Sequence, residues 1–462
     1  MRRATLFIAL LALWNLGDPR GASHPDEQYY MAISAEMQRA GTWATPTLDG
    51  QPLFYKPPLL YWFERVTYDA VGLSIVGARL PAALCLVGLS FVAALLGASF
   101  GASGALCALL TGGSLGLFAY GRLAMTDVPL ALILAGAFFC VWRARERQSP
   151  RWLCGAGVLG GAGMLLKGPV ALVVLFVGAA AFAFLAERRV RDPLRRLLWI
   201  TVASAIALAV AAPWYLLMLS RHGRNFFDFF FVQMNFDRFT SPWHASSLVT
   251  LWGGFLVALL PWMPLGVAAI AHALSRGRWR DERRLFLLCW AGATLAVFSL
   301  PAQKWPHYGL PAVVPIAILV ALFASESRHL RTLHIAAAAG LGVLGLLLSG
   351  VAPALGYSPW PAGALPQRPL AVYGQPQGLI ELSSGRVASR LWHQEEIANA
   401  IAARMLVWIP EREWHSSAVT GATILASTPR FRSGAGIADV WRACREGRVD
   451  QLLEQILVVG LP

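Results

Sequence analysis

Charged residues are scarce in this sequence, and lysine is scarcer still. Only 14% of the 462 residues are charged, against 56% that are hydrophobic, and just three of the 39 basic residues are lysines. Soluble domains carry about a quarter charged residues, so this composition predicts a membrane protein. The net charge of +14 lies in short clusters between long apolar runs. A nucleic-acid binder would instead interleave basic patches with aromatic residues.

Cysteine is also sparse, and the sequence shows no internal repeat or low-complexity tract. Five of the six cysteines lie in or beside apolar segments, and no C-x-x-C pair is present. Neither a disulfide framework nor a zinc site is therefore indicated. The cysteines are Cys85, Cys107, Cys140, Cys154, Cys289 and Cys444.

Long apolar runs dominate the first three quarters of the chain. A bilayer core of roughly 30 Å requires about 20 apolar residues in a helix. The sequence predicts an all-α polytopic membrane protein with about eleven transmembrane helices. The short first run follows Arg2 and Arg3 and is interpreted as a retained helix, because no clean signal-peptide cleavage site follows it. The predicted spans centre on 4–17, 80–98, 103–119, 128–142, 152–167, 169–186, 197–219, 249–274, 285–301, 308–324 and 333–355.

Clusters of arginine orient these spans, because loops rich in basic residues stay in the cytoplasm. With a cytoplasmic N-terminus, all five clusters fall on the cytoplasmic side: Arg2-Arg3, 143–151, 188–196, 276–284 and 328–331. The opposite face then holds the long loop 18–79, shorter loops near 120–127, 167–168, 220–248 and 302–307, and everything after about 356. Residues 1–355 are thus predicted to form a transmembrane domain. Residues 356–462 are more polar and are predicted to form a small soluble α/β domain outside the membrane.

The three lysines all fall on the face opposite the arginine clusters. They are Lys56, Lys167 and Lys304, and each lies close to proline or glycine. A compact ammonium is a good partner for phosphate, so the three together predict a shared anionic ligand. The alternative is that each lysine only extends its ammonium to the lipid headgroups.

Acidic residues on that same outer face give the complementary charge. Asp26 and Glu27 come just after the first span, and Asp127 begins a later one. An acid at membrane depth costs a few kcal/mol by insertion scales and is usually functional when it is kept. The alternative for both aspartates is a helix cap or first-turn position. Capping does not exclude catalysis, since a cap also faces the loop where a substrate would lie.

Several motifs resemble a known family. The run Asp26-Glu27-Gln28-Tyr29-Tyr30, followed by Lys56-Pro57-Pro58-Leu59-Leu60-Tyr61-Trp62, resembles the opening of the bacterial aminoarabinose (4-amino-4-deoxy-L-arabinose) transferases. These are relatives of the protein O-mannosyltransferases and have the GT-C membrane fold of glycosyltransferase family 83. The resemblance covers about 1–325, and its later landmarks follow in order: 121–127, Lys167-Gly168-Pro169, Pro213-Trp214-Tyr215 and 301–311.

The resemblance implies an undecaprenyl-phosphate sugar donor, inverting transfer to lipid A or another envelope acceptor, and no nucleotide or essential metal. It places the protein in the bacterial inner membrane, with the active site and the small C-terminal domain facing the periplasm. Asp26 and Asp127 match the family's two outer-loop aspartates and are the predicted catalytic residues. The predicted substrate-binding residues are Glu27, Tyr30, Lys56, Arg122, Lys167, Arg238, Lys304, His307 and Tyr308.

The sequence departs from the family at Tyr55. Some members carry a glutamate there, which pairs with a histidine of the middle loop around a zinc ion. No metal site is therefore predicted here, and His244 is only a candidate ligand.

The implied reaction breaks the anomeric bond and leaves negative charge on a polyprenyl phosphate, which cations already in place would stabilise. Asp26 would act as a base if the acceptor is a hydroxyl, or would position the donor sugar if the acceptor is an ionised phosphate. Three other functions stay open: mannosyl transfer to protein or glycan from polyprenyl-phosphate mannose, a secondary transporter or flippase, and a non-catalytic scaffold. Transporters often carry internal repeats and charges near mid-membrane, and this sequence shows neither.

Overall fold

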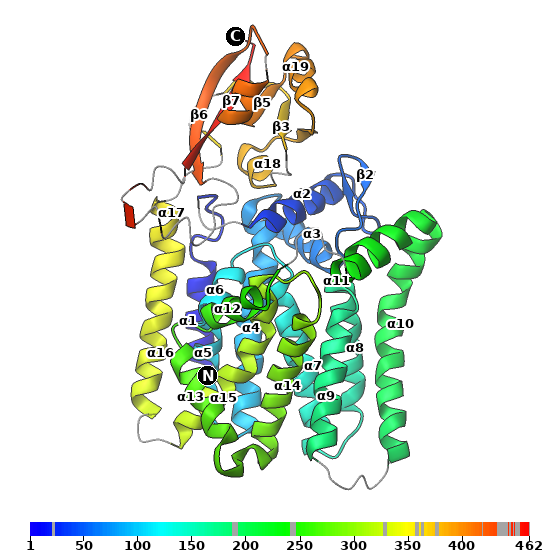
Figure 1. The fold of residues 1–462 in the computed structure, drawn as a ribbon, viewed down its shortest axis with the longest axis vertical. Helices are drawn as coiled ribbons and strands as arrows, with labels where there is room; N and C mark the ends of the chain where they lie inside the picture. The colour runs from blue at the N-terminus through cyan, green and yellow to red at the C-terminus, as the bar shows by residue number, and fades with distance from the viewer. Residues whose placement is uncertain are drawn as a thin grey trace.

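The protein is a helical bundle that carries a β-sheet at one end (Figure 1). The structure is a computed structural model, and it describes residues 1–20, 24–186, 193–240, 246–326, 330–355, 360–361, 365–374, 378–417, 419–431, 442, 445–446, 448 and 453–461. The bundle helices are α1 (Arg2–Leu13), α4 (Ile75–Ser99), α5 (Gly104–Gly112), α6 (Leu115–Tyr120), α7 (Asp127–Glu146), α8 (Trp152–Lys167), α9 (Val170–Ala186), α10 (Pro193–Phe226), α12 (Leu248–Ala258), α13 (Met263–Leu274), α14 (Glu282–Ser299), α15 (Leu310–Ser325) and α16 (Leu330–Gly345). Short turns of helix join or extend them: η1 (Phe227–Asp237), α11 (Arg238–Thr240), η2 (Ser275–Arg280), η3 (Pro306–Gly309), η4 (Leu346–Val351) and α17 (Ala352–Leu355).

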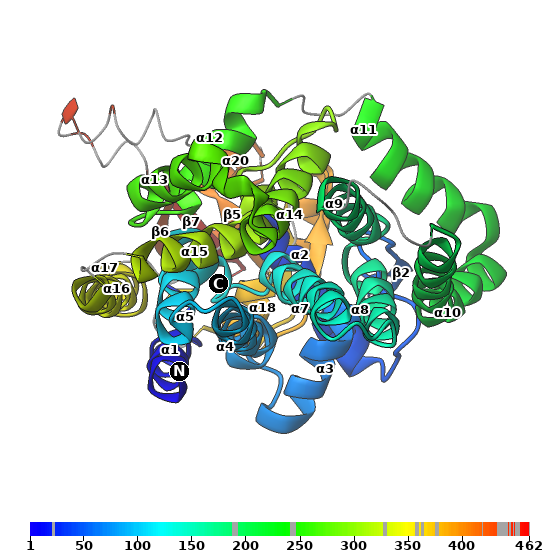
Figure 2. The same cartoon turned by 90° about the horizontal axis from the view of Figure 1, so that it is seen from below.

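Helices occupy every segment that the sequence predicts to span the membrane. Within the described residues, five are long and apolar enough to cross a bilayer, or six if the bent pair α12 and α13 counts as one span. The chain is therefore a multi-pass membrane protein, and the number eleven stays a prediction. Seen along the bundle in Figure 2, α16 and α10 lie at opposite flanks, with α7, α14 and α15 between them. The apolar window of 306–325 is 78% buried, whereas those of the two flanking spans are 28% buried and leave their apolar side chains for lipid.

Two of the predicted spans are interrupted, and the two interruptions contact each other. The predicted span 103–119 divides into α5 and α6, and 249–274 divides into α12 and α13, which meet at 103°. Pro261 has no backbone N–H and cannot continue the helix. The backbone N–H of Leu115 donates to the carbonyl of Leu260 at 2.7 Å, and the indole of Trp262 donates to the carbonyl of Gly113 at 3.1 Å. Each break thus supplies partners for polar groups that the other leaves free.

The first long loop folds into a layer across one end of the bundle. It contains α2 (Pro25–Arg39), the short hairpin β1 (Thr47–Leu48) and β2 (Gln51–Pro52), and α3 (Leu59–Val71). The N-terminus of α2 is well defined, because the ring of His24 accepts from the backbone N–H of Asp26 and Pro25 takes the first position. The buried pair of Arg79 and Glu27 ties α2 to α4, with two contacts at 2.8 and 3.1 Å.

The C-terminal part forms a mixed five-stranded sheet in the order β4-β3-β5-β7-β6. The strands are β3 (Leu370–Tyr373), β4 (Ala388–Leu391), β5 (Leu406–Pro410), β6 (Thr423–Phe431) and β7 (Leu453–Gly460), with helices α18 (Gly378–Ser384), α19 (Gln394–Ala402) and α20 (Glu411–Ser416). β3 pairs in parallel with β4 and β5, whereas β7 pairs antiparallel with β5 and β6. A sheet with helices therefore exists where the sequence predicts an α/β domain, and a domain boundary at 356 stays a prediction.

The sheet region is attached to α2. The backbone N–H of Leu379 in α18 donates to Gln28 at 2.9 Å, and Arg39 pairs with Glu381 at 3.1 Å. Gly378 makes the close approach possible, because a Cβ at this position would lie 2.5 Å from the Cβ of Met31. α18 and α2 therefore form one packed unit above the bundle (Figure 1).

Candidate active site

Most of the predicted site residues meet at the end of the bundle that α2 and α3 cover. They come from segments far apart in the sequence: α2, the loop before α3, the start of α7, the end of α8, the start of α11 and η3. The opposite end holds the arginine-rich connections, where Arg145 at the end of α7 pairs with Glu282 at the start of α14 at 2.8 Å. The residues brought together are Asp26, Lys56, Asp127, Lys167, Arg238, His307 and Tyr308.

Asp127 at the start of α7 and Lys167 at the end of α8 form a buried ion pair. The ammonium of Lys167 lies 2.5 Å from Oδ1 of Asp127, and the two side chains are only 7% and 3% exposed. Nε2 of His307 lies 3.9 Å from the same oxygen, and the ring of Tyr308 lies under the ammonium at 4.7 Å. Oδ2 of Asp127 is buried and has no hydrogen-bond partner among the residues that the structure describes. One oxygen of this carboxylate is therefore neutralised, and the other is free to accept from a substrate.

A cluster of aromatic rings lines the site beside Asp127. Nδ1 of His307 lies 3.3 Å from the hydroxyl of Tyr120, and the ring of His24 meets that of His307 edge-on at 5.3 Å. His24 and Tyr120 are absent from the sequence prediction. In the sequence, only their positions could indicate a place in the site. His24 directly precedes Pro25 and Asp26, and Tyr120 directly precedes the motif at 121–127.

Asp26 lies on the other side of the site and contacts Tyr55. The hydroxyl of Tyr55 donates to Oδ1 of Asp26 at 3.1 Å. The ammonium of Lys56 lies 5.2 Å from the centre of the Tyr55 ring, and the guanidinium of Arg238 lies 5.5 Å from it. Asp26, Lys56 and Arg238 therefore surround one tyrosine, and the predicted convergence of the first-loop carboxylate and lysine is present.

Lys56 and Arg238 are cations that lack an anionic partner. Within the part of the chain that the structure describes, no carboxylate oxygen lies within 4.0 Å of either group, and Nε of Arg238 is buried without a hydrogen bond. The pKa of Lys56 is lowered to about 7, first by burial of the ammonium and then by the positive charges of Arg238 and Lys167. Burying two cations without a carboxylate partner costs free energy in the empty protein. An anion such as phosphate would offset this cost by forming charge-assisted hydrogen bonds with both.

Three residues that the sequence predicts as substrate-binding also contact the protein itself, and their substrate roles stay predictions. Glu27 accepts two contacts from Arg79 and one from the backbone N–H of Ala124 at 2.9 Å. The guanidinium of Arg122 donates to the last carbonyls of α1, at 3.1 Å to Leu11 and 2.6 Å to Ala12. The last carbonyls of a helix have no hydrogen-bond partner within the helix, so the Arg122 guanidinium supplies one.

Lys304 is the third of these residues, and its ammonium donates to the carbonyl of Pro301 at 2.6 Å. Tyr30 is buried, and its ring packs against Tyr55 at 6.0 Å and Tyr61 at 6.2 Å, so it supports the site from behind. His244 lies outside the described residues.

The residues present do not fit the zinc site that some relatives carry. The hydroxyl of Tyr55 is a donor to Asp26, and burial raises the pKa of Tyr55, so the phenol stays protonated and is a poor metal ligand. The described residues contain no group of three or more histidine, cysteine, aspartate or glutamate side chains placed to hold a metal ion. The expectation of no essential metal stays a prediction.

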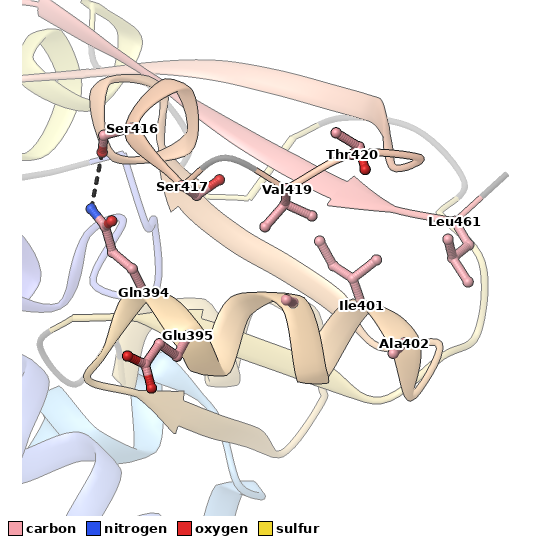
Figure 3. A pocket seen from close by; sticks show the side chains of 10 residues that line it. Gln394, Glu395, Ile401, Ala402, Ser416, Ser417, Val419, Thr420 and Leu461 are labelled. Atoms are coloured by element: carbon pink, nitrogen blue, oxygen red, sulfur yellow. Dashed lines mark hydrogen bonds between the residues drawn. The ribbon is translucent and has the colours of Figure 1, made fainter.

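Two cavities lie elsewhere in the molecule. One, of about 570 Å³, lies between α19 and the segment around Val419 (Figure 3), where Gln394 donates to Ser416 at 3.0 Å. The other, of about 880 Å³, lies between α7, α8, α9 and α10 near Arg145, at the arginine-rich end. Neither is lined by the aspartate and lysine residues described above, so the candidate site is the cluster at the covered end.

Comparisons with known proteins point to the same group of transferases as the motifs. Residues 55–216 match the model of the dolichyl-phosphate-mannose-protein mannosyltransferase family. An undecaprenyl phosphate-alpha-4-amino-4-deoxy-L-arabinose arabinosyl transferase of Yersinia enterocolitica is 27% identical over 414 residues, which cover 84% of this chain and 72% of the relative. Proteins of the same name from Serratia proteamaculans and Yersinia pestis are 28% and 29% identical, and the chain spans 58% and 60% of their lengths.

Among solved structures, the crystal structure of ArnT from Cupriavidus metallidurans bound to undecaprenyl phosphate superposes with a TM-score of 0.73. Its sequence identity is 18%, and the match covers 98% of this chain and 97% of that one. The apo form of the same protein gives a TM-score of 0.72. The resemblance that the motifs indicate is therefore confirmed: the chain has the GT-C fold of ArnT, is similar in sequence to the arabinosyl transferases, and matches the mannosyltransferase family over residues 55–216.

Proposed function

We propose that this protein is a membrane glycosyltransferase that moves an aminopentose from undecaprenyl phosphate to lipid A or another envelope acceptor. The observation that carries the proposal is the pair of cations Lys56 and Arg238, which have no carboxylate partner among the described residues and lie around Tyr55, the hydrogen-bond donor to Asp26. This grouping suits a substrate in which a phosphate adjoins a sugar. The names of the similar transferases supply the sugar and the carrier.

The reaction breaks the bond between the anomeric carbon and the phosphate oxygen, and the electron pair leaves with the phosphate. Lys56 and Arg238 hold that phosphate, so they stabilise the charge that grows as the bond breaks. Each charge-assisted contact is worth about 1.5–3 kcal/mol net, and 1.4 kcal/mol corresponds to a factor of about ten in rate. The two cations together would contribute roughly two to four orders of magnitude.

The two carboxylates act on the side of the sugar and the acceptor. Asp26 takes the proton of a hydroxyl acceptor, or positions the donor sugar when the acceptor is an ionised phosphate of lipid A. Asp127 is held in place by Lys167, and its free oxygen accepts from a hydroxyl or amino group of the substrate. In either case the acceptor attacks opposite the phosphate, which inverts the anomeric centre.

The site faces the periplasm of the bacterial inner membrane. This part of the proposal rests on the arginine-rich ends of α7 and α14, which lie at the other end of the bundle. Basic loops stay in the cytoplasm, so the end with Lys56 and Asp26 faces outward.

Reconstituted proteoliposomes test the function directly. Undecaprenyl-phosphate aminoarabinose and lipid A are supplied, and the product is followed by mass spectrometry. We expect wild-type protein and Arg412→Ala, which changes an exposed arginine of α20, to add one aminopentose, and Asp26→Asn and Lys56→Ala to insert normally but transfer none. Full activity in either site variant would refute the assignment. Solute flux without transfer would support a transporter.

The match to the mannosyltransferase family favours a second candidate donor. A parallel reaction therefore supplies polyprenyl-phosphate mannose and a protein acceptor. If transfer occurs only in this reaction, the proposed donor sugar becomes mannose, and the proposed roles of Lys56 and Arg238 are unchanged.

A further inference from the structure

Tyr55 lies between the residues proposed to bind phosphate and the carboxylate proposed to act on the acceptor. It precedes Lys56 in the loop before α3, and its ring and its hydroxyl make separate contacts. Neither the motifs nor the proposed function gives this side chain a task. Its surroundings nevertheless connect it to three of the groups that the reaction requires.

The hydroxyl of Tyr55 is fixed as a donor to the carboxylate. It donates to Oδ1 of Asp26 at 3.1 Å. Burial raises the pKa of Tyr55, and the charge of Asp26 acts in the same direction, so the proton stays on the phenol at neutral pH. Hydrogen bonds to charged groups are stronger and more directional than those between neutral groups. Asp26 is therefore held in one orientation by a donor that does not ionise.

The ring of Tyr55 is fixed in turn by the groups around it. It stacks on Tyr29 with centroids 5.5 Å apart and an interplanar angle of 19°, and it packs against Tyr30 at 6.0 Å. Lys56 and Arg238 both lie within 6 Å of its centroid. A cation at this distance from an aromatic ring is attracted by the electrons of the ring. The ring thus attracts both cations, although their positive charges repel each other.

We propose that Tyr55 is a positioning residue that aligns the Asp26 carboxylate with the Lys56 and Arg238 phosphate site. This inference rests on the proposed function. It assigns to one side chain the task of keeping the phosphate-binding cations and the Asp26 carboxylate in their relative positions. The hydroxyl sets the direction of the carboxylate, and the ring sets the place of the cations. The two roles predict different losses when the hydroxyl or the whole ring is removed.

Three replacements separate the two roles. Tyr55→Phe removes only the hydroxyl, replacement by 4-aminophenylalanine keeps a donor on an aromatic ring, and Tyr55→Leu removes ring and donor together. Tyr373→Phe in β3 is the matched control, because it removes a tyrosine hydroxyl in the C-terminal sheet. Each protein is reconstituted, and both its affinity for undecaprenyl phosphate and its kcat for transfer are measured.

We expect Tyr55→Phe to lower kcat about ten- to a hundredfold, the loss of one hydrogen bond to a charged group, and to change the affinity by less than about twofold. The 4-amino replacement restores most of kcat. Tyr55→Leu lowers kcat as well and also weakens undecaprenyl phosphate binding by about five- to thirtyfold, because two cations lose the ring. A Tyr55→Phe protein with wild-type kcat, or one whose affinity falls as far as its kcat, would overturn the inference.

A spectroscopic measurement tests the alignment even if no transfer occurs. The infrared carboxylate band of Asp26 is identified as the band that disappears in Asp26→Asn. In Tyr55→Phe this band shifts in frequency, since the carboxylate has lost its donor, and in Tyr373→Phe it does not. An unshifted band refutes the positioning role by itself. Absence of transfer in the wild-type protein with every donor and acceptor refutes the proposed function, whatever the band does.

Discussion

Binding of undecaprenyl phosphate is expected to weaken as the pH rises above neutrality, because of Lys56. The pKa of Lys56 is lowered to about 7 in the free protein, mainly by burial, so half of the molecules carry a neutral amine at pH 7. A bound phosphate favours the charged form and raises this pKa again. Below pH 7 the ammonium of Lys56 is mostly present already, so this residue adds little further pH dependence there. Above pH 7 the binding reaction must first add a proton, and the affinity falls up to about tenfold per pH unit.

The size of the effect follows from the lowered pKa. If the complex keeps Lys56 charged throughout the range, the dissociation constant rises about fiftyfold between pH 7 and pH 9. The measurement is a titration of labelled undecaprenyl phosphate into protein in lipid nanodiscs at several pH values. Lys56→Arg is the matched variant, since a guanidinium stays charged over this range and should remove the dependence. A flat affinity in the wild-type protein, or an equal slope in Lys56→Arg, would refute the reasoning.

Other expectations concern the ion pairs and the sheet contact. Lys167→Arg should retain more transfer activity than Lys167→Ala, because the charge beside Asp127 matters more than shape, and equal losses would indicate a packing role. Arg79→Ala should lower the free energy of unfolding by about 3–5 kcal/mol, because it leaves the buried Glu27 without its cation. Normal thermal stability with selective loss of transfer would instead indicate that Glu27 contacts the substrate. Gly378→Val should cost about 1–3 kcal/mol by overpacking against α2, measured by thermal unfolding, and an unchanged midpoint would contradict the close approach.

The convergence of Asp26, Lys56 and Asp127 could be predicted from the sequence because orientation in a membrane is strongly constrained. Basic clusters fix which ends of the spans are outside, and residues at those ends are confined to one layer. The family motifs then indicate which residues of that layer belong to the site. Nothing in the sequence, however, distinguishes Arg122 from Arg238. Both are arginines near a predicted outer loop, and only the packed structure shows that Arg122 caps α1 while Nε of Arg238 has no hydrogen-bond partner among the described residues.

Tyr55 shows a second limit of sequence reasoning. In the sequence, Tyr55 stands out only as the residue at the position where the resembling family can carry a glutamate, which indicates a lost metal ligand and nothing more. Its hydrogen bond to Asp26 spans 29 residues, and its contact with Arg238 spans far more. Hydrophobic periodicity gives no information on such contacts between loops.

Helix locations were easier to predict than helix continuity. Long apolar runs indicate where helices lie, but the breaks near Gly113 and Pro261 depend on partners about 145 residues apart. Glycine and proline lower the cost of a break without requiring one, since both also occur inside continuous spans such as α4, which contains Pro81.

The paired breaks have a consequence for biosynthesis. When the ribosome has made only the first half of the chain, the carbonyl of Gly113 and the N–H of Leu115 lack their partners from Leu260 and Trp262. A polar backbone group without a partner costs several kcal/mol in lipid. The early helices therefore cannot reach their final packing until α12 and α13 have entered the membrane, and a chain truncated before that point should be a preferred substrate for membrane quality-control proteases.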